Sequence, residues 1–162
     1  MRILLISPAY PPSISGLANA VSMQARLLIE LGHEVDIATG GDVTRVRVDP
    51  ELNVNIFQFS VSGEKSLLHP IRGDVSEYKN FLLNSRYDFV IFNAWQIWST
   101  DIALGILQSI SGKKILYSHG ISTNVFFKSD LIASIIRYVL WRPYWWNIKK
   151  IMKNLDGVIF LS

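Results

Sequence analysis

Three short stretches of this 162-residue chain carry polar side chains of the kinds that bind or transform a small polar ligand. An imidazole is both a hydrogen-bond donor and an acceptor when neutral, and side-chain amides also offer both functions. Backbone N–H groups at the start of a helix attract an anion instead. The three stretches are, in chain order, Ser15 and Gly16; Asn93, Trp95 and Gln96; and His119.

Ser15 and Gly16 end a proline-rich segment and precede a helical pattern that runs from residue 17 to residue 31. The first turn of such a helix has unpaired backbone N–H groups and a partial positive charge, which together favour a phosphate. The spacing therefore predicts an anion site. The alternative is that Gly16 serves only to permit a tight turn into the helix.

His119 follows directly after an apolar run at residues 114–118 and precedes Gly120. A histidine at the end of a strand can donate a hydrogen bond to a ligand hydroxyl or help to stabilise charge that develops during a reaction. The alternative is a histidine that only caps a loop. Asn93 and Gln96 carry side-chain amides that can also donate or accept a hydrogen bond, and they follow an apolar run at residues 88–92.

The elements that must position these residues alternate along the chain. Apolar runs predict strands at 2–7, 34–38, 53–59, 88–92, 114–118 and 156–161, with a short edge piece at 43–48. Helical patterns lie at 17–31, 74–86 after a capping Asp74, 99–110 after Ser99 or Thr100 with a stop at Gly112, and 129–154 with a break or bend at Pro143; residues 60–70 look irregular.

This alternation predicts an α/β fold: a Rossmann-like, doubly wound parallel sheet in a three-layer α/β/α sandwich. Ligands of such sheets bind beyond the carboxyl ends of the strands. We therefore expect Gly16, Asn93 and His119 to lie at one edge of the sheet.

Composition excludes several classes of protein. The chain has no cysteine, which excludes disulfides, thiolate zinc sites and a cysteine nucleophile. It has neither a dinucleotide fingerprint nor a phosphate-binding P-loop, and we expect no metal and no cofactor. A net charge of +3 without a long basic run predicts no nucleic-acid partner. The first residues do not form a signal peptide, and the apolar segment 131–141 is shorter than the ~18 residues of a membrane span.

The segment from Trp141 onward mixes aromatic and basic residues. Aromatic rings favour the lipid headgroup layer and lysines attract anionic lipid, so this segment is a candidate membrane surface. The alternative is that the rings pack on the sheet while the lysines stay in water. The residues concerned are Trp145, Trp146, Lys149, Lys150 and Lys153.

The opening of the chain resembles that of the family 4 retaining glycosyltransferases, which have the two-domain GT-B fold. The resemblance rests on SPAYPP, a glycine, a helix and then LGHEV, and the final DGVIFLS is similar to the last strand of the family's amino-terminal domain. It implies that residues 1–162 are the amino-terminal, acceptor-side domain, and that a carboxyl-terminal donor-binding domain would follow. The full enzyme would transfer a sugar from a nucleotide diphosphate sugar to a sugar or lipid-linked acceptor with retention of configuration.

The resemblance also implies roles for individual residues. His119 matches a histidine that lies beside the donor sugar, and Ser15-Gly16 stands where relatives have two glycines near the donor phosphate. Relatives often carry histidines where this chain has Asn93 and Trp95. The acceptor side of the cleft would be formed by Tyr10, Asn93, Trp95 and Gln96.

Two other functions fit the same pattern. One is a non-catalytic, flavodoxin-like binding or regulatory module, although residues 2–16 lack the carboxylates that a phosphorylatable receiver needs. The other is a fragment of a GT-B sugar-nucleotide epimerase. As a glycosyltransferase domain the isolated chain would be inactive or nearly so, and we expect it in the cytoplasm, peripherally at the inner face of the membrane.

Overall fold

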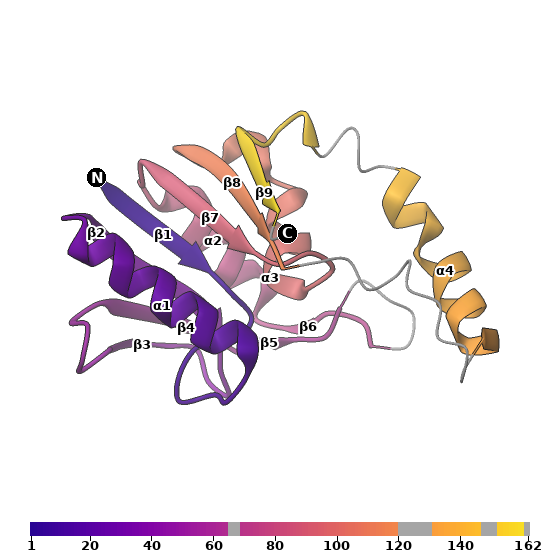
Figure 1. The fold of residues 1–162 in the computed structure, drawn as a ribbon, viewed down its shortest axis with the longest axis horizontal. Coiled ribbons are helices and arrows are strands. Elements are labelled where there is room, and N and C mark those ends of the chain that lie inside the picture. The colour runs from indigo at the N-terminus through magenta and orange to yellow at the C-terminus, as the bar shows by residue number, and fades with distance from the viewer. Residues whose placement is uncertain (65–68, 120–130, 147–151, 161–162) are drawn as a thin grey trace.

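The computed structural model of this chain describes residues 1–64, 69–119, 131–146 and 152–160. A seven-stranded sheet has the order β3-β4-β2-β1-β7-β8-β9, and every neighbouring pair is parallel except β3 and β4 (Figure 1). The strands are β1 (Arg2–Ile6), β2 (Glu34–Gly40), β3 (Arg45–Val48), β4 (Asn55–Phe59), β7 (Phe89–Asn93), β8 (Lys113–Ser118) and β9 (Gly157–Phe160), and a separate hairpin joins β5 (Val61–Ser62) to β6 (Arg72–Gly73).

Helices cover both faces of the sheet, as the alternating pattern predicted (Figure 1). One face packs against α1 (Gly16–Glu30), and the other packs against α2 (Val75–Asn84) and α3 (Trp98–Leu104), with a 3-10 turn, η1 (Leu107–Ser109), after α3. The central strand β1 is buried from both sides, and Leu4, Leu5 and Ile6 are each 0% exposed. The predicted three-layer, doubly wound α/β sandwich is therefore confirmed.

The prediction for the third helix was wrong at both ends. It placed Ser99 or Thr100 at the cap and continued to residue 110, whereas α3 begins at Trp98 after Ile97 and ends at Leu104. The backbone is extended at Ile97, so the helix begins one residue later, and Thr100 lies in its first turn. The Thr100 hydroxyl donates to the carbonyl of Ala94 at 2.8 Å, which links the preceding loop to this turn.

Two further segments differ from the sequence prediction. Part of the stretch expected to be irregular forms the β5–β6 hairpin, where Val61 pairs with Gly73. The helix α4 (Leu131–Trp146) is not broken at Pro143 but continues to Trp146. It lies on the side of the sheet toward which the carboxyl ends of the strands point (Figure 1).

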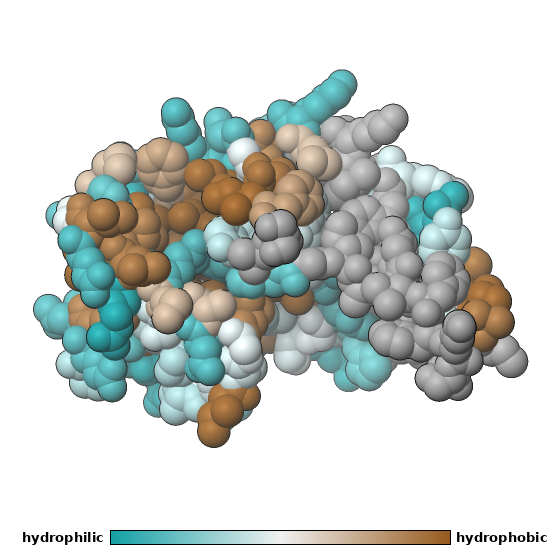
Figure 2. Space-filling view, viewed as in Figure 1, coloured by the Kyte–Doolittle hydropathy of each residue, from teal (hydrophilic) through white to brown (hydrophobic). Residues whose placement is uncertain are grey.

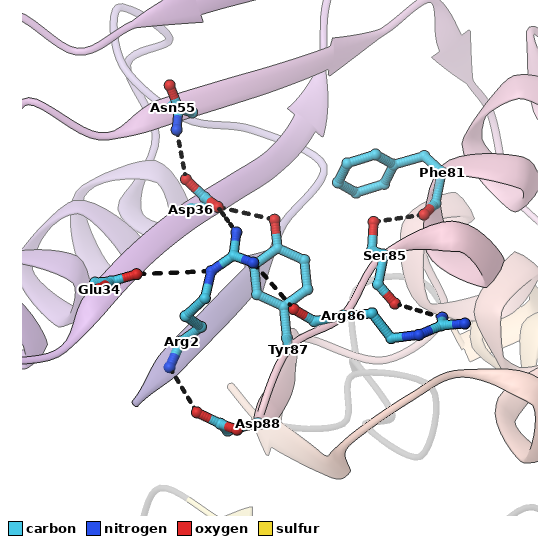
Figure 3. Close-up of polar contacts among 9 residues, drawn as sticks. All are labelled: Arg2, Glu34, Asp36, Asn55, Phe81, Ser85, Arg86, Tyr87 and Asp88. Carbon is cyan, nitrogen blue, oxygen red and sulfur yellow. Dashed lines mark hydrogen bonds and ion pairs between the residues drawn. The ribbon is translucent and has the colours of Figure 1, made fainter.

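The amino-terminal edge of the sheet is held together by a polar cluster around Asp36 (Figure 3). The Asp36 carboxylate accepts hydrogen bonds from the Tyr87 hydroxyl and the Asn55 amide, both at 2.9 Å, and pairs with Arg2 at 3.4 Å. Burial and the adjacent Asp36 charge raise the pKa of Tyr87 above its ordinary value. The bonds link β1, β2, β4 and the turn before β7, at the end of the sheet opposite the carboxyl edge.

Candidate functional site

Four polar residues lie at the same level across four neighbouring strands at the carboxyl edge of the sheet. Ile6 in β1 pairs with Ala38 in β2 and with Phe92 in β7. The next residues along these three strands are Ser7, Thr39 and Asn93. Asn93 in turn pairs with Tyr117 in β8. Side chains alternate along a strand. The residues two positions earlier, Leu5, Ile37, Ile91 and Ile115, all belong to the core on the α1 face or pack against it. Ser7, Thr39, Asn93 and Tyr117, the polar row, therefore face α1.

His119 lies two residues beyond Tyr117 and contacts the polar row. Its Nε2 atom is 3.3 Å from Oδ1 of Asn93, and its ring lies 5.1 Å from the ring of Tyr117. Partial burial lowers the pKa of His119 below its ordinary value of 6.5, because desolvation disfavours the imidazolium form. His119 is therefore neutral near pH 7, the state that both donates and accepts a hydrogen bond.

Buried polar atoms without a partner gather at this edge. Asn93 is 1% exposed, and its Nδ2 atom has no hydrogen-bond partner within the described part of the chain. The same holds for Oγ1 of Thr39, Oγ of Ser99 and Nε2 of Gln96. Buried polar groups in native proteins nearly always have a partner, so a concentration of unpartnered ones indicates a place for a ligand or ordered water.

The start of α1 lies at the same edge and leaves room for a ligand. Ser15 caps the helix, and its Oγ accepts from the backbone N–H of Ala18 at 3.0 Å. The N–H groups of Gly16 and Leu17 are the remaining donors of the first turn. Gly16 is exposed, and a Cβ atom built on it meets nothing within 4 Å. Packing of the described residues therefore does not require a glycine at position 16.

No protein-family model matches the sequence, and no curated protein matches it. Solved structures do match the fold. The sucrose-phosphate synthase of Thermosynechococcus elongatus covers 99% of this chain at a TM-score of 0.64 and 17% identity. An alpha-glucosyltransferase in complex with UDP and a 13-mer DNA covers 99% at a TM-score of 0.54 and 16% identity. The chain has the fold of one GT-B domain.

The GT-B domain described here spans 42% of the sucrose-phosphate synthase chain and 37% of the alpha-glucosyltransferase chain. It also spans 77% of a shorter chain of the same synthase, at a TM-score of 0.57 and 16% identity. At these identities the likeness shows the fold alone. The carboxyl edge of this GT-B domain brings together Ser15, Gly16, Asn93 and His119, as the chain order of strands and loops predicted.

The loop between β7 and α3 of this GT-B domain is strained. Ala94 and Gln96 have φ values of 80° and 56°, in the left-handed region that residues other than glycine seldom adopt. Trp95 lies between them, is 6% exposed and packs into the core on the α2 and α3 face. Its ring therefore serves core packing, although the sequence alone suggested an exposed contact with the acceptor. Strain of this kind is stored at functional sites, and here it accompanies the unpartnered amide of Gln96.

Tyr10 supports the loop before α1 from within the core. It is 3% exposed, and its hydroxyl donates to Asp49 at 3.0 Å; burial and this carboxylate raise the pKa of Tyr10 to about 12. Arg47 holds the same loop through a hydrogen bond to the carbonyl of Pro11. The acceptor contact expected of Tyr10 stays a prediction.

The candidate membrane surface is described only in part. Lys149 and Lys150 lie outside the described residues, as does the side chain of Trp145; Trp146 is 74% exposed, and Lys153 is also exposed. No helix within the described residues is long and apolar enough to span a bilayer. Sequence reasoning missed the exposed apolar side chains of α4, which we call the α4 outer face: Leu131, Ile135, Ile136, Val139, Leu140 and Trp146.

Sequence reasoning also missed Ser7 and Thr39. Both are polar residues at the carboxyl end of an apolar strand: Ser7 directly follows β1, and Thr39 is the second-last residue of β2. A polar residue at the end of an apolar run is also the signal that identified Asn93. The missing information was the register, since only the strand pairing puts them level with Asn93 on the α1 face.

Proposed function

We propose that this chain is the amino-terminal, acceptor-side domain of a two-domain glycosyltransferase that transfers a sugar from a nucleotide diphosphate sugar with retention of configuration. The observation that carries the proposal is the concentration of unpartnered buried polar groups at the carboxyl edge, beside the open N-terminus of α1. Two solved structures with the same fold, named a sucrose-phosphate synthase and a glucosyltransferase, support it.

Each part of the edge has a role in this proposal. The first turn of α1, with Ser15 and Gly16, holds the donor phosphate through backbone N–H groups and the helix dipole. His119 is the catalytic residue and lies beside the donor sugar, where a neutral imidazole stabilises developing charge through hydrogen bonds. The acceptor, a sugar or a lipid-linked sugar, lies against the strained loop and its neighbours: Tyr10, Asn93, Trp95 and Gln96.

The proposed donor-binding half lies in a second domain, so this chain alone should bind donors weakly. Titration calorimetry of the 162-residue chain with a panel of nucleotide sugars is expected to show no affinity in the micromolar range. The physical reason is that the first turn of α1 offers few hydrogen bonds to a donor. Micromolar binding of one donor would instead assign the donor site to this domain.

Substitution of Gly16 tests the phosphate contact in the two-domain enzyme. Gly16→Val should leave the domain folded, because a Cβ atom built at this position meets nothing within 4 Å, yet it should keep the donor phosphate away from the helix end. Hydrogen bonds to a charged group contribute about 1.5–3 kcal/mol each, so the KM for the donor should rise roughly 10- to 100-fold.

Gly157→Val is the matched control for this substitution. Gly157 opens β9 at the amino edge of the sheet, and a Cβ atom there also meets nothing within 4 Å. The control should leave the KM unchanged. If both variants behave alike, Gly16 has no special contact with the donor.

Transfer itself is tested with the two-domain protein and radiolabelled nucleotide sugars. Sugar transferred to an acceptor supports the proposal, and the anomeric configuration of the product tests retention. Interconversion of the donor without transfer would favour a sugar-nucleotide epimerase, and a protein that binds ligand without turnover would be a binding module.

A further inference from the structure

The contact between Asn93 and His119 has a direction that the chemistry of the two groups fixes. The amide oxygen Oδ1 accepts hydrogen bonds and cannot donate them. In this orientation of the amide, Oδ1 lies 3.3 Å from Nε2 of His119. A hydrogen bond between these atoms requires the proton of the neutral ring to be on Nε2, which leaves the lone pair on Nδ1. The other half of the amide, Nδ2, is buried and has no partner in the described part of the chain.

We propose that Asn93 is a positioning residue that fixes His119 as the Nε2–H tautomer, so that the pair offers one acceptor, His119 Nδ1, and one donor, Asn93 Nδ2, to ligand hydroxyl groups. This proposal deepens the proposed function, on which its saccharide ligand rests. It assigns to Asn93 a second task, the orientation of His119, in addition to its direct contact with the ligand.

The surroundings hold Asn93 in place. It is 1% exposed at the end of β7, where it pairs with Tyr117 in β8. The backbone N–H of Ala94, the next residue, donates to the carbonyl of Tyr117 at 2.9 Å and keeps the two strands together at this point. The ring of Tyr117 lies beside the ring of His119, with the two ring centroids 5.1 Å apart.

The donor and acceptor atoms of the pair select the class of ligand. A phosphate oxygen accepts hydrogen bonds, so it gains nothing from the lone pair of Nδ1, and a metal cation is repelled by the amide donor. A hydroxyl group both donates and accepts. Two hydroxyl groups of one sugar ring therefore satisfy Nδ1 and Nδ2 together, whereas the N–H groups at the start of α1 suit the anionic part of a donor.

Nitrogen NMR of the 162-residue chain tests the tautomer directly. Long-range ¹⁵N–¹H spectra near pH 7.5 should show His119 with a protonated Nε2 and an unprotonated Nδ1. In Asn93→Leu the Nε2 proton should exchange with water at least ~10-fold faster, because its acceptor is gone. Asn19→Leu, at an exposed position of α1, is the matched control and should leave the His119 signals unchanged. A wild-type Nδ1–H tautomer, or no change in Asn93→Leu, would overturn the proposal.

The conservative variant Asn93→Asp gives a second readout. A carboxylate keeps an acceptor facing Nε2 but adds a negative charge, which should raise the pKa of His119 by about 1 to 3 units. In the wild-type protein burial lowers this pKa, and the titratable side chain that touches the ring is Tyr117 from β8. An unchanged pKa in Asn93→Asp would show that residue 93 does not face the imidazole.

The ligand class is tested separately with methyl α-D-glucoside and inorganic phosphate as probes. At high millimolar concentration the glucoside should shift the side-chain signals of His119 and Asn93, and phosphate should not. Shifts with phosphate alone would overturn the assignment to hydroxyl groups. The tautomer result does not depend on turnover, so an enzyme without transferase activity but with the Nε2–H tautomer would contradict the proposed function and leave the positioning role intact.

Discussion

Replacing His119 by alanine is expected to lower turnover of the proposed two-domain enzyme by on the order of 10² to 10³, the usual cost of removing one hydrogen-bonding group that stabilises charge in a transition state. The imidazole lies at the carboxyl edge of β8, is neutral near pH 7 and is oriented by Asn93. Alanine removes both ring nitrogens while the strand that carries the residue keeps its pairing with β7.

Steady-state kinetics of transfer, with circular dichroism to confirm folding, measure this effect. His33→Ala is the matched control, because His33 precedes β2 at the opposite edge of the sheet. The control should retain wild-type turnover. Wild-type turnover in His119→Ala would remove His119 from the site.

The pH dependence of turnover should also depend on the protonation of His119. Burial lowers the pKa of His119, so the midpoint of its protonation lies below pH 6.5. Protonation of Nδ1 removes the acceptor, so turnover should fall as the pH decreases, with the midpoint of this fall below pH 6.5. The acidic limb of the profile should be absent from His119→Ala.

The fold could be predicted from the sequence because each helix and strand has a recognisable local sequence pattern. Buried parallel strands have continuous apolar runs, as at Ile3–Ile6 and Phe89–Phe92, and α1 closes on Gly32, whose φ of 81° favours glycine. Knowing that loops after parallel strands meet at one edge was then enough to bring Gly16, Asn93 and His119 together.

What the sequence could not predict depends on pairing between distant residues. Ser7 and Thr39 lie level with Asn93 because of the register in which their strands pair. The cluster at the amino edge joins Arg2 to Asp36, 34 residues away, and Asp36 to Tyr87, 51 residues away. The local sequence pattern predicted a helix cap at Ser99 or Thr100. In the structure the Thr100 hydroxyl donates to the carbonyl of Ala94, which lies outside the helix.

The position of α4 bears on the proposed membrane surface. The apolar side chains of the α4 outer face are exposed, and Figure 2 shows hydrophobic residues at the end of the molecule where α4 lies. Tyr138 and Trp141, on the same helix, are half-buried. Burial against the sheet therefore does not account for Trp146, which is 74% exposed.

Charge adds to this apolar face. The charged residues from 131 to 154 are all basic: Arg137, Arg142, Lys149, Lys150 and Lys153. An exposed apolar helix face followed in the sequence by basic residues has the character of an amphipathic helix that lies in the headgroup layer of an anionic membrane. Such a position would suit the lipid-linked acceptor of the proposed function.

We expect the chain to bind anionic vesicles about a hundredfold more strongly than neutral vesicles. Each lysine near an anionic surface contributes about 1 kcal/mol, and Lys149, Lys150 and Lys153 together supply the hundredfold. Salt shortens the Debye length from about 10 Å at 0.1 M to about 3 Å at 1 M, so the difference should nearly vanish at high salt. Co-sedimentation with both kinds of vesicle at low and high salt measures it.

Two variants separate the charge from the apolar face. Replacing Lys149, Lys150 and Lys153 by glutamine should abolish the preference for anionic vesicles, whereas replacing Lys79 and Lys113, on α2 and β8, should not. Trp146→Ala should weaken binding to both kinds of vesicle, because it removes the exposed ring from the headgroup layer. Equal, negligible sedimentation of the wild-type chain in all four conditions would show that α4 does not bind lipid, and its outer face would then need a protein to cover it.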